Sequence, residues 1–498
     1  MWVSDLKNRH AVSLRRLFPS ASFVGCADIH VTSVSENSKD CSLGCLFAAI
    51  PGTKADGSEF IQEAIAKGAV SLLSDRPQPG VALPQCVVPH VRTAHGILCQ
   101  ALYGLPSRRL KTVGITGTNG KTTTTYLVRS ILQAASLQTG LLGTIEYHDG
   151  TLSEVSHLTT PDAPTLASWL HRMTENKTTH AVFELSSHAL HQGRTAGVEL
   201  DAAVVTNMTH DHLDYHQTFE SYLESKAQIL KQIKPEGSVI LNQDDLYARA
   251  LRSDCGSQHK VVLHSSQKEA QVFATQIVET LTETRFLLHL PETTIPIQTL
   301  LIGRHNIDNC LSAAAACREL GIPPEAIAEG IEQLENVPGR LEAVEAGQDY
   351  NIFVDYAHTD DALARCLDTL KPLTKNRLIC VFGAGGDRDR TKRPKLAKAA
   401  AKADRVIVTS DNPRSEDPDQ IIEDILKGFA GESSQVQTEP DRRLAIRLAM
   451  ESAEPGDTIL VAGKGHETYQ IIGEERHAFD DREIIRDNLK QTAMRMSA

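Results

Sequence analysis

A glycine-rich segment that could bind phosphate runs from Thr116 to Thr123, between the apolar stretch VGI and the helix-like stretch TTTYLVRSILQAA. Glycines let backbone N–H groups turn toward a phosphate, and the start of a helix adds partial positive charge. Lys121 could reach the β- and γ-phosphates of a nucleotide, and the Thr122 hydroxyl could ligate Mg²⁺. A strict Walker motif would place glycine at position 115, which is isoleucine here. The segment still predicts a nucleotide site rather than a glycine turn that only caps a helix. The expected contacts are Thr116, Gly117, Thr118, Asn119, Gly120, Lys121, Thr122 and Thr123.

Two later segments carry side chains that suit a metal ion. Glu184 ends the apolar stretch HAVFE, and His212 lies in NMTHDHLDYH, after the next apolar stretch. A nucleotide site needs hard oxygen ligands for Mg²⁺, and a carboxylate provides them. The density of histidine and aspartate also allows a zinc hydrolase, or histidines that only cap helices or lie on the surface. Beside a phosphate loop, magnesium is the favoured interpretation.

Three polar clusters follow apolar stretches in the last third of the chain: GGDRDR (385–390), DNPR (411–414) and GKGHE (463–467). The first is a poor dinucleotide motif, because Arg388 stands where a third glycine is needed. Arginines bind carboxylates through two hydrogen bonds, whereas Asp411 and Glu467 suit an ammonium group. The clusters together predict a pocket for a zwitterion. The alternative for DNPR is an ordinary turn with an exposed arginine.

Alternating strand-like and helix-like stretches must position these residues. CLFAAI, VGIT, HAVFEL, SVILN, NIFVDY, RLICVFGAG and TILVAGKG read as strands, with helical patterns between most of them. Such alternation predicts an α/β fold with parallel sheets, whose ligands gather beyond the carboxyl ends of the strands. Polar breaks near 106–109 and 336–340 predict three domains: a small α/β domain (1–107), a central P-loop ATPase-like domain (108–336) and a Rossmann-like domain (337–498).

Composition narrows the class of protein. The 498 residues carry a net charge of −12, which argues against nucleic acid as a partner. We find no run of about 18 apolar residues and no secretion signal, so no membrane span is expected. The ten cysteines are scattered, which is typical of reduced thiols in a cytoplasmic protein.

Four segments in order, GITGTNGKTT, ELSSHAL, NMTHDHLDYH and YLESKAQIL, resemble the central domain of the Mur ligases. This resemblance implies an ATP-dependent, amide-bond-forming ligase of peptidoglycan precursor synthesis. It also implies that Lys226 is carbamylated and that the carbamate helps to hold magnesium, since an ammonium group cannot ligate a cation. On its own, Lys226 would be read as a solvated lysine on a helix.

The resemblance assigns further residues to ligands. It implies that Thr122 and Glu184 hold one magnesium ion and that His212 and the Lys226 carbamate serve a second. Asn309 in GRHNIDN, Arg340 in PGR and Asp355 in DYAH are implied to lie near ATP. The first domain is implied to hold the UDP moiety. The implied contacts of the UDP-muramoyl-dipeptide are Ser38, Thr159, Thr160, Ser186, Gln192 and Arg194.

Within the family, DNPR resembles the signature of members that add meso-diaminopimelate to UDP-N-acetylmuramoyl-L-alanyl-D-glutamate. Diaminopimelate has a far carboxylate that lysine lacks, so a buried Arg414 would be paired by the first and left unpaired by the second. The implied contacts of this amino acid are Arg388, Asp411, Asn412, Pro413, Arg414, Gly463 and Glu467.

The implied reaction passes through an acyl phosphate of the D-glutamate side chain, with closure of the last domain about Pro338–Arg340. Four alternatives remain open. Three are ligases: a lysine-adding enzyme, a dipeptide-adding enzyme and a folylpolyglutamate synthase. The fourth is a catalytically silent nucleotide-binding regulator.

Overall fold

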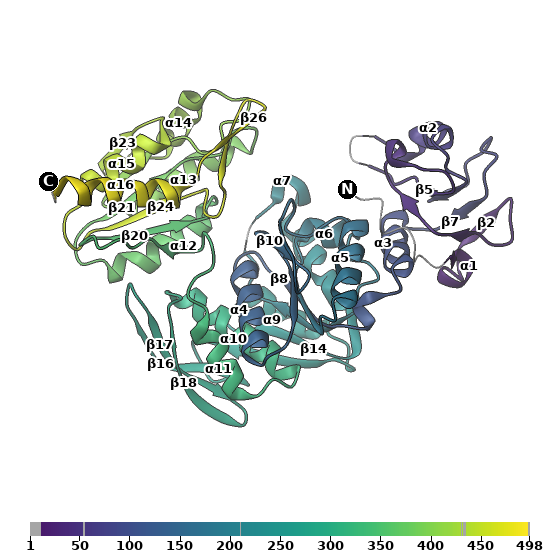
Figure 1. Cartoon of the computed structure of the whole chain (residues 1–498), viewed down its shortest axis with the longest axis horizontal. Coiled ribbons are helices and arrows are strands. Elements are labelled where there is room, and N and C mark those ends of the chain that lie inside the picture. The colour runs from purple at the N-terminus through teal and green to yellow at the C-terminus, as the bar shows by residue number, and fades with distance from the viewer. Residues whose placement is uncertain (1–10, 53–54, 210, 430, 432–434, 497–498) are drawn as a thin grey trace. The chain divides into compact units, whose positions relative to one another are not determined.

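The computed structural model describes residues 11–52, 55–209, 211–429, 431 and 435–496 (Figure 1). The chain divides into two compact units. The first contains Met1–His264 and Ser312–Ile327, and the second contains Ser265–Leu311 and Ala328–Ala498. Helices α10 (Arg304–Glu319) and α11 (Pro324–Gln333) cross the division between them.

The amino-terminal part of the first unit is the small α/β domain that the sequence predicts. Its five-stranded sheet has the order β2-β7-β6-β5-β4, with only the β2–β7 pair antiparallel. A short β1–β3 pair lies outside this sheet. The strands are β1 (Val12–Ser13), β2 (Ser22–Val24), β3 (His30–Val31), β4 (Val34–Ser35), β5 (Leu46–Ala48), β6 (Ser71–Ser74) and β7 (Gln85–Val87). The helices are α1 (Leu14–Leu17), α2 (Ile61–Ala66) and α3 (Val91–Leu102).

The rest of the first unit is built on a larger sheet of strands in the order β11-β10-β9-β12-β8-β13-β14-β15. From β9 to β15 neighbouring strands run parallel, and β10 and β11 form an antiparallel hairpin. Strand β12 is buried along its whole length, as expected of a parallel strand covered on both faces. The strands are β8 (Lys111–Thr116), β9 (Thr139–Leu142), β10 (Glu146–His148), β11 (Ser153–Val155), β12 (His180–Glu184), β13 (Leu200–Val205), β14 (Ile233–Asn242) and β15 (Lys260–Ser265). The helices are α4 (Lys121–Ala134), α5 (Ala163–Glu175), α6 (Ser187–His191), α7 (Leu213–His216), α8 (Phe219–Ala227) and α9 (Leu246–Ala250).

The second unit contains three antiparallel strands, β16 to β18, and a six-stranded sheet in the order β19-β20-β24-β21-β22-β23. The strands from β20 to β23 along this sheet are parallel, which confirms the predicted alternation. The strands are β16 (Val272–Glu279), β17 (Thr284–Leu290), β18 (Thr293–Thr299), β19 (Glu342–Ala343), β20 (Asn351–Asp355), β21 (Leu378–Phe382), β22 (Arg405–Val408), β23 (Gln435–Thr438), β24 (Thr458–Ala462), β25 (Tyr469–Ile472) and β26 (Glu475–Ala478). The helices are α12 (Asp360–Leu370), α13 (Arg393–Ala400), α14 (Pro418–Leu426), α15 (Arg442–Glu451) and α16 (Asp481–Met496).

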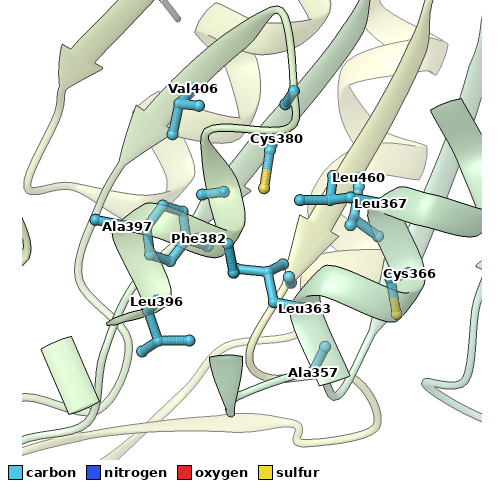
Figure 2. Close-up of a cluster of buried hydrophobic side chains, with 14 of the residues drawn as sticks. Ala357, Leu363, Cys366, Leu367, Cys380, Phe382, Leu396, Ala397, Val406 and Leu460 are labelled. Carbon is cyan, nitrogen blue, oxygen red and sulfur yellow. The ribbon is translucent and has the colours of Figure 1, made fainter. Parts of the chain in front are cut away.

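The six-stranded sheet buries apolar side chains on both of its faces. On one face Phe382 and Leu460 pack with residues of α12 and α13, as Figure 2 shows for Leu363, Leu367 and Leu396. The other face packs against α15 and α16. The strands are thereby fixed, and so are the loops that leave their carboxyl ends.

The structure contains the free thiols that the sequence predicts. All ten cysteines are free thiols, and eight of them are buried. Among the described residues, no helix is both long enough and apolar enough to cross a bilayer.

A fully buried ion pair joins the last two helices of the second unit. Arg442, at the start of α15, donates to both carboxylate oxygens of Asp481, at the start of α16, over 2.8 and 2.7 Å. It also donates to the carbonyl of Ala462, the last residue of β24, over 3.0 Å. The pair therefore ties both helices to the end of a central strand.

We expect Arg442→Met to lower the free energy of unfolding of the second unit by about 3–5 kcal/mol, because the substitution leaves a buried carboxylate without a cation. Urea unfolding measures this change. The matched control is Arg447→Ala on the same helix, whose pair with Glu451 is largely exposed and should contribute about 0.5 kcal/mol or less. Equal losses in the two variants would contradict the structural importance of the buried pair.

Candidate functional site

The predicted phosphate-loop and metal residues leave neighbouring parallel strands. Strand β8 lies between β12 and β13, and Glu184 stands opposite Ile115 while Val205 stands opposite Thr116. All three strands therefore deliver their following residues to one edge of the sheet. The residues that follow β8, β12 and β13 therefore come together at this edge.

The phosphate loop is held from one side by the segment after β13. Asn207 accepts a hydrogen bond from the Asn119 N–H over 3.0 Å, and the Thr118 N–H donates to the Asn207 carbonyl over 2.8 Å. Gly117 has a φ of +145°, and a Cβ atom there would lie 1.9 Å from the Thr206 hydroxyl oxygen. The Thr116 hydroxyl donates to the Leu185 carbonyl, so this side chain serves the sheet rather than the loop.

Two lysines converge on this loop. Lys121 donates to the carbonyls of Gly117 and Thr118 over 2.9 and 2.8 Å. Lys226, on α8, donates to the same Gly117 carbonyl over 2.6 Å and is fully buried. Burial lowers the pKa of Lys226 well below its usual value, and the positive charge of Lys121 lowers it further. Lys226 is thus a buried amine at the phosphate loop, not a solvated surface lysine.

Glu184 is the centre of a second set of contacts. Its carboxylate accepts hydrogen bonds from the Thr122 hydroxyl at 3.1 Å, the Thr144 hydroxyl at 2.9 Å and the Thr144 N–H at 2.8 Å. The side chain is buried, and no lysine or arginine of the described part of the chain forms an ion pair with it. Thr144 was not predicted, although it follows the end of β9 in the same way as the other site residues follow their strands.

The residues expected to contact the muramoyl dipeptide form one network beside Glu184. The Thr160 hydroxyl donates to the Glu184 carbonyl over 2.8 Å and accepts from the Ser186 N–H over 2.9 Å. Arg194 donates to the Gln192 side chain over 2.9 Å and to the Thr160 carbonyl over 3.4 Å. Thr159 accepts from the Thr144 hydroxyl over 3.2 Å.

Ser38 lies in the amino-terminal domain and donates its hydroxyl to Glu63 over 2.6 Å. Two residues earlier, burial raises the pKa of Glu36, and the charge of Asp162 raises it further, whereas Arg92 and Arg194 lower it. Glu36 thus lies within electrostatic range of Arg194. A uridine diphosphate contact by Ser38 stays a prediction.

His212 has a φ of +53°, and its ring packs edge-on against His188 with 4.8 Å between centroids. Burial lowers the pKa of His212 to about 4, and nearby positive groups at His188, Lys121 and Lys226 contribute, so the imidazole is neutral at physiological pH. A neutral imidazole can ligate a metal ion. The described residues contain no group of three or more histidine, cysteine, aspartate or glutamate side chains that could hold a metal, so they offer no zinc site of the hydrolase type.

The residues expected near ATP in the last part of the chain belong to the second unit. Buried Asp355 accepts from the Leu341 and Ala357 N–H groups, both over 2.7 Å. Burial raises its pKa, and Arg340 opposes the shift. The Asn309 amide donates to Asn306 over 3.0 Å, on the helix that the sequence predicts. Since the phosphate loop lies in the first unit, a shared nucleotide site stays a prediction.

The three clusters of the zwitterion pocket leave the adjacent strands β21, β22 and β24. Asn412 donates to Glu467 over 2.9 Å, and a Cβ atom on Gly463 would lie 2.5 Å from an Asp411 oxygen. These contacts bring the DNPR and GKGHE clusters together. Pro413 lies against the GGDRDR loop, because a Cβ atom on Gly386 would lie 1.8 Å from its carbonyl oxygen.

Two arginine side chains lie beside Gly385 of the GGDRDR loop. A Cβ atom there would lie 3.0 Å from Arg414 Nη1 and 3.6 Å from Arg388 Cγ. Arg414 donates to the Gly386 carbonyl over 2.6 Å. Arg388 is exposed and Arg414 is half-buried, so the expectation of a buried Arg414 is wrong. Arg414 has a φ of +53°, and its backbone pairs with the hairpin of β25 and β26.

Comparisons with known proteins cover most of the chain. Residues 30–102 match the family model described as Mur ligase family, catalytic domain; residues 115–317 match Mur ligase middle domain; and residues 339–465 match Mur ligase, glutamate ligase domain. They appear in the order of the three expected domains, whose boundaries stay predictions.

Relatives that match over nearly their whole length share one name. A UDP-N-acetylmuramoyl-L-alanyl-D-glutamate--2,6-diaminopimelate ligase of Geobacillus thermodenitrificans is 40% identical over 469 residues, which cover 93% of this chain and 95% of that protein. One of Synechococcus elongatus is 43% identical over 471 residues, covering 92% and 94%. A solved structure of a ligase with the same name has a TM-score of 0.69 and 32% identity, and the match covers 97% of this chain and all of that one.

We expect Gly117→Ala to weaken ADP binding by about tenfold or more. The new Cβ would overlap the Thr206 hydroxyl in a strained conformation, at a cost of about 1–3 kcal/mol, and about 1.4 kcal/mol corresponds to a factor of ten in affinity. Calorimetric titration with ADP measures the change. Gly104→Ala is the control, because Gly104 also has a positive φ (+74°) but nothing lies within 4 Å of its added Cβ. Unchanged affinity in Gly117→Ala would contradict the assignment of this loop.

Proposed function

The chain belongs to the Mur ligase family, and we propose that it joins meso-2,6-diaminopimelate to the D-glutamate of UDP-N-acetylmuramoyl-L-alanyl-D-glutamate, with ATP converted to ADP and phosphate. The observation that carries the choice of amino acid is the pocket of the second unit. The supporting contacts are that Arg388 and Arg414 lie beside Gly385, and that Asn412 donates to Glu467. That arrangement matches an amino acid with an extra carboxylate.

The phosphate loop supports the use of ATP. Lys121 lies across the loop, bonded to two of its carbonyls, and can turn to the β- and γ-phosphates when a nucleotide provides better acceptors. The N–H groups at the start of α4 point to the same place. We assign Asn309, Arg340 and Asp355 to the nucleotide as well, and we propose that the last domain closes about Pro338–Arg340.

Magnesium fits the residues around Glu184. The donor set is a threonine hydroxyl and a carboxylate, which are hard oxygen ligands, and the buried carboxylate has no protein cation of its own among the described residues. We assign Thr122 and Glu184 to one ion, and His212 with a carbamylated Lys226 to a second. Bound magnesium would neutralise charge on the transferring phosphoryl group.

Lys226 has the properties that carbamylation requires. Carbon dioxide reacts with an amine in its neutral form, and burial keeps the pKa of Lys226 well below the usual lysine value. The product would place carboxylate-like oxygens where the structure has a buried amine at the phosphate loop. Since Lys121 stands at the same carbonyl, its ammonium group would attract the negatively charged carbamate.

The chain's own residues then have two tasks. Thr159, Thr160, Ser186, Gln192 and Arg194 position the muramoyl dipeptide, so that its D-glutamate carboxylate attacks the γ-phosphorus of ATP and ADP leaves. The pocket of the second unit holds diaminopimelate, whose amine attacks the carbonyl carbon of the acyl phosphate. Phosphate leaves, the nitrogen loses a proton and an amide remains. Correct placement of the reactants supplies most of the catalysis in such reactions.

Two alternatives are separated by one experiment. We expect UDP-N-acetylmuramoyl-L-alanyl-D-glutamate and ATP to yield phosphate with meso-diaminopimelate and little with L-lysine, as measured by a phosphate-release assay. Arg414→Ala should narrow the difference between the two amino acids, because the far carboxylate of diaminopimelate loses its guanidinium partner. Release with lysine alone would make the chain a lysine-adding ligase. Release with neither would indicate a silent nucleotide-binding regulator.

Carbamylation of Lys226 is tested separately. We expect ¹³C-bicarbonate to give a carbamate carbon signal in the wild type that Lys226→Arg lacks, and the variant to lose on the order of 100-fold or more in turnover. Lys231→Arg, an exposed lysine five residues further along the chain, is the control and should change neither readout. An active wild-type preparation without the signal would refute the carbamate.

A further inference from the structure

The second unit buries a lysine that the proposed mechanism does not use. Lys464 follows β24, in the GKGHE segment, and its side chain is completely inaccessible to solvent. The other fully buried cations of this unit, Arg393 and Arg442, pair with carboxylates outside the proposed pocket. Lys464 differs from them, because its hydrogen-bond partners are residues assigned to diaminopimelate.

The contacts of Lys464 form a closed triangle. Its ammonium group donates to Asn412 Oδ1 over 3.1 Å and to Glu467 Oε2 over 3.0 Å. The third side of the triangle is the bond from Asn412 Nδ2 to Glu467 Oε2, over 2.9 Å. The Ile471 N–H also donates to Asn412 Oδ1, over 3.0 Å. With two donors on its oxygen and an acceptor at its nitrogen, the Asn412 amide has only one orientation that satisfies every contact.

Glu467 is therefore fixed through one oxygen and open at the other. Oε2 takes both donors of the triangle, whereas no described residue donates to Oε1. The side chain is 15% exposed, and Oε1 is not among its buried atoms. A carboxylate can accept about four hydrogen bonds, so Oε1 keeps its capacity for a ligand ammonium group.

We propose that Lys464 is a positioning residue for the diamino acid: it holds Glu467 and Asn412 so that Glu467 Oε1 faces the ligand amine. This inference rests on the proposed function. The removal of Lys464 would leave Oε2 with a single donor and free the Asn412 amide to rotate. Glu467 could then turn away from the ligand, and the lost alignment would weaken amine binding rather than ATP binding.

The test is steady-state kinetics of Lys464→Met, which keeps the length of the side chain and removes its charge and donors. We expect the KM for the diamino acid to rise on the order of 10- to 100-fold, as a misplaced contact can cause. The KM values for ATP and for the UDP-linked substrate should stay within about twofold. Lys464→Arg, which restores the charge, should recover part of the loss. Lys427→Met removes an exposed lysine with a carboxylate three residues away, and this control should leave every KM unchanged.

A double-mutant cycle with Glu467→Gln separates positioning from a general structural role. If Lys464 acts through Glu467, Lys464→Met should add little to the KM in the Glu467→Gln background. Fully additive effects would overturn the proposal. An unchanged KM in the single variant, or equal rises in all three KM values, would do so as well.

The kinetics of the Lys464 variants are measured with whichever of meso-diaminopimelate and L-lysine supports phosphate release by the wild type. Use of lysine alone would refute the proposed substrate and still test Lys464. Release with neither amine would refute both.

Discussion

The burial of the Glu184 carboxylate is the constraint that organises the first unit. A carboxylate away from water needs donors or a cation, and the fold provides donors from the helix after the phosphate loop and from the turn after β9. The backbone carbonyl of the same residue accepts from Thr160. The residues that we assign to nucleotide, metal and muramoyl peptide therefore share contacts with one residue, Glu184.

The second unit also has a buried charged side chain at the end of a strand, but this one is positive. Its buried centre is the Lys464 ammonium group, again at the carboxyl end of a parallel strand, and again it aligns side chains from two loops. In both units the sheet brings the loops together, and one buried charged side chain orients the side chains of these loops through hydrogen bonds. The proposed chemistry is divided accordingly, with phosphoryl transfer assigned to one unit and recognition of the amine to the other.

The sequence predicts the positions of the strands better than it predicts the burial of individual side chains and their contacts. Apolar stretches such as HAVFEL and TILVAGKG identify buried parallel strands, and the strand-end rule then locates Glu184, Asn412 and Glu467. The rule does not indicate that Lys226 is buried, because burial depends on how α8 packs against the loop. It also does not indicate that Arg414 is only half-buried, in a segment that pairs with a hairpin beyond the sheet. Thr144 was missed although it satisfies the rule, since a lone threonine carries no motif.

The turn at Gly339 determines which residues move together. A side chain there would strike the backbone of Gly465 and His466, at 2.1 Å from the nearest atom, and the Gly339 carbonyl accepts from the Tyr356 N–H over 2.9 Å. A Cβ atom on Gly465 would in turn lie 2.6 Å from the Cβ of Tyr356. This backbone contact makes Arg340, Asp355 and the GKGHE segment one rigid body. The proposed closure would therefore bend the chain on the amino-terminal side of Gly339, and Arg340, Asp355 and the GKGHE segment would keep their spacing as the last domain moves.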